Sequence, residues 1–178
     1  MDHAPRHGRR HDSCGAARAG RSANGVLDAQ PLFGGLGFTD DYRKQFCRDK
    51  AISEATAHHL ATKFGTTSGE ALALGRENAA LLEPIVAEHP AIQAEVVYSV
   101  RKEMAATIED VLARRLGIQL YSWRTAIEAA PVVGSLMAAE LGWSDAATHT
   151  AITGYMEKIH HLLDAAGLPR KRSSSTAD

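Results

Sequence analysis

Helical periodicity is the feature of this sequence that most limits its fold. From about residue 53 onward, apolar side chains recur every three or four positions, and the strict alternation of a β-strand is almost absent. This spacing puts the apolar side chains of each segment on one helical face, which must be buried against another element. Because the connections between these segments are short, neighbouring helices are expected to pack antiparallel. We therefore predict an all-α fold, a compact helical bundle of about five to six helices with disordered termini.

The first two helices are predicted in the N-terminal half of the chain. Ser53 can cap a helix that runs toward Phe64, and Gly65 at its end tolerates a left-handed conformation. Ser68 is expected to cap the second helix, and Pro84 bounds its regular part. The face of the second helix that is expected to pack inward comprises Leu74, Asn78, Leu81, Leu82 and Ile85.

Two further helices are predicted in the middle of the chain. The first has an apolar face made of Val97, Val100 and Met104. Thr107 is followed three residues later by Asp110, which resembles a capping box, so a new helix is expected to begin there. The new helix carries Val111, Leu112 and Arg115.

The last two predicted helices have recognisable start and stop signals. Pro131 suits the first turn of a helix, and Gly142 can end that helix. Ser144 is expected to start the final helix, which Gly167 and Pro169 stop. The apolar faces of the two helices comprise Val133, Leu136, Met137, Leu141, Ile152, Met156, Ile159 and Leu163.

One folded region with flanking segments is expected. Residues 1–30 are mostly Gly, Ala, Arg, His and Ser, which cannot offset the entropy of ordering by burial, so we predict a disordered tail. We expect a linker and first turn over residues 31–52, a helical domain over 53–168 and a second disordered tail over 169–178. Gly34–Gly37 lacks a preceding apolar strand and a following Lys-Ser/Thr, so we interpret it as a loop rather than a phosphate cradle.

Composition argues against several classes of partner and site. The chain has 20 Lys and Arg against 21 Asp and Glu, a formal net charge of -1, so no global field favours nucleic acid or an anionic membrane. Cys14 and Cys47 are far apart and have no metal-ligand spacing, so we predict neither a disulfide framework nor a zinc site, and a reducing compartment. No run approaches the roughly 18 to 20 apolar residues of a spanning helix.

The middle of the chain resembles the signature of a known family. Residues 94–115 read AEVVYSVRKEMAATIEDVLARR, residues 59–66 read HLATKFGT, residues 129–131 read AAP and residues 136–143 read LMAAELGW. These segments are similar to the helical C-terminal domain of FAD-dependent glycerol-3-phosphate dehydrogenase, in the alpha-glycerophosphate oxidase family. The chain departs from the family pattern at Leu116–Ile118, where relatives commonly have Thr-Arg-Leu, and this makes a ligand role for that corner less secure.

The resemblance implies that this chain acts together with a separate flavin-binding part of the enzyme. The family oxidises glycerol 3-phosphate to dihydroxyacetone phosphate through FAD and passes electrons to quinone at the membrane surface. Its flavin-binding part precedes the helical domain, so we expect no cofactor in this chain and no catalysis by it alone. We therefore expect a fragment or split subunit with a flavin-bearing partner chain or self-association, located in the cytoplasm at the inner face of the membrane. The alternative is a stand-alone helical interaction module.

Arg114 and Arg115 are the candidate functional residues, because guanidinium groups suit a phosphate such as that of glycerol 3-phosphate. Adjacent helical residues point roughly 100 degrees apart, however, so the two side chains cannot easily face one ligand. Asp110 lies four residues before Arg114, which favours an intrahelical ion pair. We favour the structural role and keep a phosphate or interdomain contact as the alternative. Tyr98 and Glu103 are likewise expected to pack and to form hydrogen bonds.

Histidines form the other conspicuous set, but their spacing does not favour a metal site. His58 and His59 are consecutive, as are two histidines near the C-terminus, so the members of each pair diverge on a helix. We expect solvated helix faces for His58, His59, His149, His160 and His161. His3, His7 and His11 have four-residue spacing in a segment that is not expected to be helical, so metal binding there would be adventitious. No catalytic, cofactor-binding or metal-binding residue is assigned.

Overall fold

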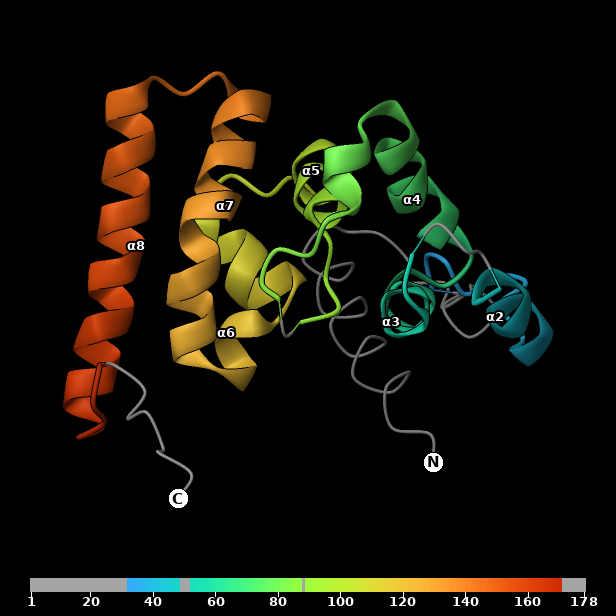
Figure 1. The fold of residues 1–178 in the computed structure, drawn as a ribbon, viewed down its shortest axis with the longest axis horizontal. Coiled ribbons are helices and arrows are strands. Elements are labelled where there is room, and N and C mark those ends of the chain that lie inside the picture. Colours follow the sequence, from blue (N-terminus) through green and yellow to red (C-terminus); the bar gives the residue numbers. More distant parts are fainter. Residues whose placement is uncertain (1–31, 49–51, 88, 171–178) are drawn as a thin grey trace, which may run out of the picture.

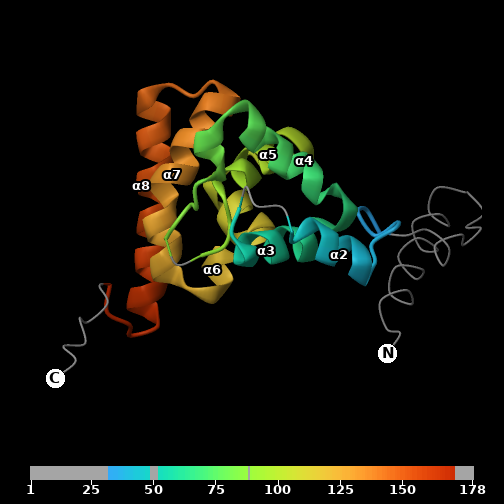
Figure 2. The same cartoon turned by 45° about the vertical axis from the view of Figure 1, so that its right-hand side comes forward.

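The computed structural model describes residues 32–48, 52–87 and 89–170, and these form seven α-helices joined by short turns. Within those ranges no extended strand occurs, so the predicted all-α class is confirmed. Helices α7 and α8 stand side by side at one end of the molecule, and α2, α3 and α4 lie at the other end (Figures 1 and 2). Helix α5 lies between the two groups and contacts both α4 and α7.

Helix α2 (Asp40–Phe46) was not expected, because it lies in the segment interpreted as a linker and first turn. Its start is set by Thr39, whose side-chain oxygen accepts a hydrogen bond from the Tyr42 backbone N–H at 3.1 Å. The Tyr42 hydroxyl donates to the Thr66 carbonyl oxygen at 3.1 Å, which ties α2 to the end of the next helix. A local cap and the long-range hydrogen bonds of the Tyr42 hydroxyl therefore hold this segment in place.

Helix α3 (Glu54–Phe64) confirms the prediction at both ends. The Ser53 hydroxyl accepts from the Thr56 backbone N–H at 3.1 Å, and Gly65 ends the helix with a φ of 57°. The Gly34–Gly37 segment is a turn packed against this end, since the Gly34 carbonyl oxygen accepts the Thr66 backbone N–H at 2.9 Å.

Helix α4 (Ser68–Glu77) is shorter than predicted. Ser68 is its first helical residue rather than its cap, and the Ser68 hydroxyl donates to the Gly65 carbonyl oxygen at 2.8 Å. Asn78 takes an extended backbone conformation, and its side chain accepts the Ala80 backbone N–H at 3.1 Å. This competing local hydrogen bond ends the helix and starts a separate 3₁₀ turn, so the single face predicted through residue 85 was wrong.

Helix α5 (Gln93–Glu103) is the central element and is buried over residues 94–99. Tyr98 packs edge-to-face on Phe64 of α3, with ring centroids 5.0 Å apart. Met104 was predicted to lie on the apolar face of this helix, but it is 88% exposed. The helix ends one residue earlier, and Met104 takes a left-handed conformation with a φ of 55°, which turns its side chain into solvent.

The predicted capping box is confirmed, but the turn that follows is a π-helix over Asp110–Arg115. The Thr107 hydroxyl accepts the Asp110 backbone N–H at 3.1 Å, and the Asp110 carboxylate accepts the Thr107 backbone N–H at 3.0 Å. The Leu116 N–H then donates to the Val111 carbonyl oxygen, five residues earlier, at 2.8 Å.

Helices α6 (Ile118–Tyr121), α7 (Trp123–Leu141) and α8 (Asp145–Ala165) complete the fold. Helix α7 starts well before Pro131, which was predicted to open it, because Ser122 caps it and accepts the Thr125 N–H at 3.2 Å. Pro131 therefore lies inside the helix. The predictions that Gly142 ends α7 and that Ser144 caps α8 are confirmed.

Two apolar clusters make up the core. The larger one joins α5, the π-helix, α6, α7 and α8, and the smaller one joins α3, α4 and α5. Met137 of α7 is fully buried in the larger cluster, as its place on the predicted apolar face requires. Because α5 contributes to both clusters, its polar residues Glu95 and Ser99 are fully buried.

Candidate functional site

Glu95 of α5 is a fully buried carboxylate that organises the centre of the candidate site. One of its oxygens accepts the Ile92 backbone N–H at 3.0 Å. The other accepts the Lys63 ammonium at 2.9 Å and lies 3.0 Å from His59 Nε2. Burial alone raises the pKa of Glu95, but the hydrogen bond from His59 and the nearby Lys63 charge outweigh burial and hold the pKa below its usual value. Glu95 therefore stays ionised in the core.

His59 was predicted to lie on a solvated helix face, and this was wrong because His59 turns toward Glu95. His89, which the sequence did not single out, packs edge-to-face on His59 with ring centroids 5.8 Å apart. Its Nδ1 accepts the Ala91 backbone N–H at 3.1 Å, so Nε2 carries the proton of the neutral ring. Burial lowers the pKa of His89, and the nearby His59 lowers it further. His58 stays exposed, as predicted.

The other predicted histidines lie away from this cluster. His149 and His161 on α8 are exposed, as expected, and His160 is half-buried. His3, His7, His11 and Cys14 fall outside the described residues. Within residues 32–48, 52–87 and 89–170, no group of three or more His, Cys, Asp or Glu side chains is arranged to hold a metal ion.

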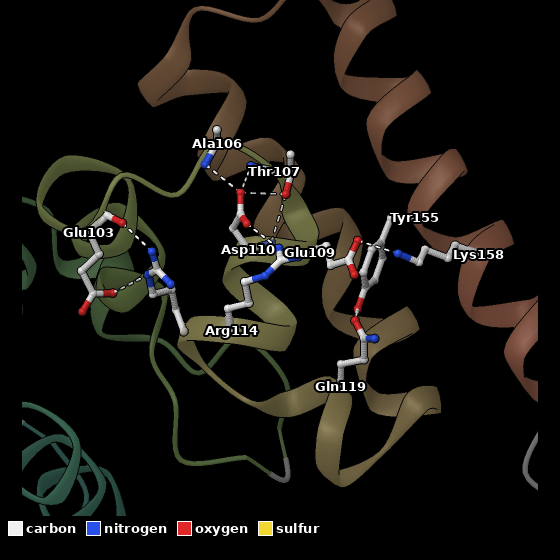
Figure 3. Close-up of polar contacts among 10 residues, drawn as sticks. Glu103, Ala106, Thr107, Glu109, Asp110, Arg114, Gln119, Tyr155 and Lys158 are labelled. Atoms are coloured by element: carbon white, nitrogen blue, oxygen red, sulfur yellow. Dashed lines mark hydrogen bonds and ion pairs between the residues drawn. The ribbon is translucent and has the colours of Figure 1, made fainter. Parts of the chain in front are cut away.

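Asp110 is held at the start of the π-helix by an unusually complete set of donors (Figure 3). Its carboxylate accepts the Ala106 N–H, the Thr107 N–H and the Thr107 hydroxyl, and its second oxygen accepts Arg114 Nη1 at 2.5 Å. The Thr107 hydroxyl contributes most to lowering the pKa of Asp110, with the backbone donors and Arg114 adding to it. The intrahelical ion pair that the spacing predicted is therefore present.

Arg115 points to a different partner. Its Nη2 donates to the Glu103 carbonyl oxygen at 2.7 Å, and its Nε lies 3.5 Å from the Glu103 carboxylate. Arg114 and Arg115 thus diverge, as adjacent helical residues should, and each is oriented by an acidic residue of this chain. The two guanidinium groups are positioned by separate contacts rather than aimed together at one ligand.

A second polar group lies where α8 meets the π-helix and α6 (Figure 3). The Tyr155 hydroxyl donates to Gln119 Oε1 at 2.9 Å, and burial raises the pKa of Tyr155. Lys158 pairs with the Glu109 carboxylate at 2.7 Å. A hollow of about 350 Å³ beside these residues is mostly apolar, so this region joins helices rather than gathering reactive groups.

A larger groove, of about 850 Å³, lies between α3, the π-helix and α6. Its apolar lining includes Leu116, Leu120 and Tyr121, and its charged or titratable nitrogen-bearing residues are His58, His59, Lys63, His89, Arg114 and Arg115. Among the described residues that line it, none is an aspartate or a glutamate. The structure therefore brings Arg114 and Arg115 to the same groove as the His59 cluster, which sequence spacing did not predict.

The sequence did not identify Lys63 and His89, which line this groove, or Glu95, the buried partner of Lys63. The only local signal was Glu95 itself, a carboxylate inside the apolar run from Ala94 to Val100. Such a residue must either face solvent or find buried partners. Its partners lie 32 and 36 positions away along the chain, so no short spacing could identify them.

Comparison with known proteins shows which domain family the chain belongs to. Residues 27–148 match the family model described as the C-terminal domain of alpha-glycerophosphate oxidase. The chain is 32% identical over 115 residues to the probable mitochondrial glycerol-3-phosphate dehydrogenase of Dictyostelium discoideum, covering 65% of this chain and 18% of that protein.

Two further relatives show the same pattern of coverage. Identity is 31% over 118 residues to the mitochondrial glycerol-3-phosphate dehydrogenase of Homo sapiens, covering 64% of this chain and 16% of the relative. The chain is 29% identical over 101 residues to glycerol-3-phosphate dehydrogenase 2 of Mycobacterium tuberculosis strain H37Rv. This alignment covers 57% of this chain and 17% of the relative. The chain thus spans less than a fifth of the length of these relatives. No solved structure gives a significant match.

Proposed function

Because the chain belongs to the family of the C-terminal domain of alpha-glycerophosphate oxidase, we propose that it is the helical, non-catalytic domain of an FAD-dependent glycerol-3-phosphate dehydrogenase. In this role it supports the oxidation of glycerol 3-phosphate to dihydroxyacetone phosphate, with electrons passing to quinone. The observation that carries the proposal is the family match over residues 27–148, which extends from α2 into the start of α8.

We infer that the described residues do not hold FAD. The Gly34–Gly37 turn is the only described glycine cluster that could suggest a phosphate cradle, and it is closed against α3. A Cβ added at Gly34 would lie 2.2 Å from the Phe64 carbonyl oxygen, so the Gly34 backbone packs against the end of α3 rather than facing a phosphate. We therefore assign the flavin, and the oxidation of the substrate carbon, to a part of the enzyme other than these residues.

The side chains of the signature support a structural role within the enzyme. Asp110, Arg114, Arg115 and Glu103 are all committed to contacts inside this chain, and Glu95 is enclosed among its own partners. Residues that already have such partners stabilise an arrangement of helices more readily than they perform a reaction. Their function would be to hold α3, α5 and the π-helix in a fixed relation.

The contact with the flavin-bearing part is proposed to involve the loop at residues 32–38. Leu32 and Phe33 are 87% and 84% exposed there, and Leu36 is exposed beside them. Clustered exposed apolar side chains commonly mark interaction surfaces. When this loop has no partner, the same surface is expected to drive self-association of the chain.

Within residues 32–48, 52–87 and 89–170, no helix is long and apolar enough to cross a membrane. We propose that the complete enzyme works in the cytoplasm, at the inner face of the membrane.

Co-expression with a flavin-bearing chain encoded immediately upstream tests this proposal. Glycerol-3-phosphate-dependent reduction of a quinone-like dye is expected from the two chains together and not from either alone. The double variant Leu32→Ser, Phe33→Ser should weaken co-purification, whereas Met104→Ser, at another exposed apolar residue, should not.

The alternative, a stand-alone interaction module, predicts a different outcome. In that case no upstream flavin-bearing chain is found, or its dye reduction is unaffected by this chain. Sedimentation at increasing concentration adds an independent measurement, because a chain that remains monomeric and binds no apolar dye would contradict an uncovered docking surface.

A further inference from the structure

One side of the groove between α3, the π-helix and α6 is apolar and faces solvent instead of packing in the core. Leu120 and Tyr121 of α6 are 79% and 86% exposed, although both line the groove. Helix α6 is anchored by Ile118, which is fully buried, so the two exposed side chains are held outward by a fixed element. Figure 2 shows α6 lying beside α3, across the same region of the molecule.

The opposite side of the groove is basic because the acidic partners lie behind it. Glu95 is fully buried, and neither Asp110 nor Glu103 lines the groove. The cations that these carboxylates orient, namely Lys63, Arg114 and Arg115, do line it. Carboxylates thus orient these basic groups, and Arg114 remains the most exposed of the three, at 56%.

Arg114 keeps hydrogen-bonding capacity that its own ion pair does not use. Its side chain is 56% exposed and gives one nitrogen, Nη1, to Asp110. A guanidinium has five N–H donors, so Nε and Nη2 remain available to a second carboxylate. His58 is exposed at the same groove and can add a further donor.

We propose that this groove is a docking site for an acidic peptide segment of a partner protein. An apolar side chain of that segment packs on Leu120 and Tyr121, and its flanking carboxylates pair with Arg114 and His58. Charge complementarity selects the occupant, since Arg114 and His58 are exposed at the groove and none of its described lining residues is a carboxylate. Tyr and Arg are also the residue types that most often contribute binding energy at protein interfaces.

A small anion fits the same groove less well. The volume of about 850 Å³ exceeds what a phosphate ion requires, and much of the lining is apolar, including Ala113, Leu116 and Pro90. A phosphate would leave this apolar surface exposed to water, whereas a peptide would cover it. The inference is independent of the proposed enzymatic role, because any acidic protein segment with an apolar anchor satisfies it.

The experiment uses fluorescence anisotropy with the full chain and two labelled peptides. In one peptide a Leu-Phe pair is flanked on each side by glutamates, and in the other the flanks are lysines. We expect the acidic peptide to bind, the basic peptide not to bind, and binding to weaken as salt is raised. Inorganic phosphate is added as a competitor and should not displace the acidic peptide.

Variants with matched controls locate the binding surface. Arg114→Glu and Tyr121→Ser should each weaken binding by about tenfold, the range expected for losing a contact at an interface. Lys158→Glu is the control for the first variant, because Lys158 is similarly exposed at 52% and similarly paired, but lies outside the groove. Met104→Ser is the control for the second. Circular dichroism checks that each variant is folded. If Arg114→Glu does not fold, Tyr121→Ser still tests whether the groove binds the peptide.

Three outcomes would overturn the proposal. Equal binding of the two peptides would show that charge does not select the occupant. Displacement by phosphate would identify a small-anion site instead. Equal loss in the Arg114 and Lys158 variants, or in the Tyr121 and Met104 variants, would show that binding occurs elsewhere. None of these results depends on glycerol-3-phosphate oxidation, so they are separable from a failure of the enzymatic role.

Discussion

Replacing Glu95 is the most informative perturbation of this domain, because one buried carboxylate connects α3 to α5. Glu95→Gln keeps an oxygen for the Ile92 N–H but removes the negative charge that holds Lys63 and His59. Breaking a fully buried ion pair costs about 3–5 kcal/mol. Lys63 and His59 keep some contact with solvent, so they can be rehydrated, and we expect a smaller loss of about 2 kcal/mol.

Glu95→Ala should cost more, about 3–4 kcal/mol, because it also leaves the Ile92 N–H without a partner and creates a cavity. Urea unfolding followed by circular dichroism measures both variants. Glu140→Gln is the control, since Glu140 also pairs with a basic residue, Arg101, but at an exposed site where such pairs contribute about 1 kcal/mol or less.

The same carboxylate predicts how stability depends on pH. The pKa of Glu95 is lowered on folding, so its contribution to stability is present above the ordinary, unfolded pKa of about 4.5 and is lost as pH falls through the folded pKa. As pH falls below about 5, the free energy of unfolding should therefore decrease more for the wild-type chain than for Glu95→Gln. Parallel pH profiles for the two chains, or an unchanged urea midpoint for Glu95→Gln, would refute the proposed role of this network.

Three further predictions test other parts of the structure. Met137→Asp should destabilise the fold by several kcal/mol, because it buries an unpartnered carboxylate, whereas His160→Ala should change the melting temperature little. Gly34→Ala should cost about 1–3 kcal/mol, since φ is 75° and the new Cβ would meet the Phe64 carbonyl oxygen, while Gly154→Ala in open space on α8 should be neutral or stabilising by calorimetry. The purified chain should show no flavin absorbance, and stoichiometric FAD would contradict the interpretation of the glycine turn.

Sequence alone determined the fold class and the caps before α3, the π-helix and α8. The caps at Ser53, Thr107 and Ser144 involve residues only three positions apart, so their geometry follows from local chemistry. The ion pair between Asp110 and Arg114 is equally local. Helical periodicity also placed Met137 in the core, because the apolar face of a helix must be buried somewhere.

Helix boundaries were harder to predict where two nearby sequence features favour different start or end residues. Pro131 looked like a helix start, but the stronger cap at Ser122 begins α7 earlier and carries the helix through the proline. Met104 fits the apolar period of α5, yet the chain turns left-handed at this residue and exposes it. In both cases a neighbouring segment, rather than the residue's own preference, decided the outcome.

The candidate site was decided by tertiary structure. Glu95 meets His59 and Lys63 across separations of 36 and 32 residues, and the groove gathers side chains from α3, the π-helix and α6. A sequence pattern reports which residues share one helical face, but not which faces meet, because that depends on the packing of the whole core. Local sequence thus specified helical segments, and the packing of α3, the π-helix and α6 brought the side chains of the basic groove together.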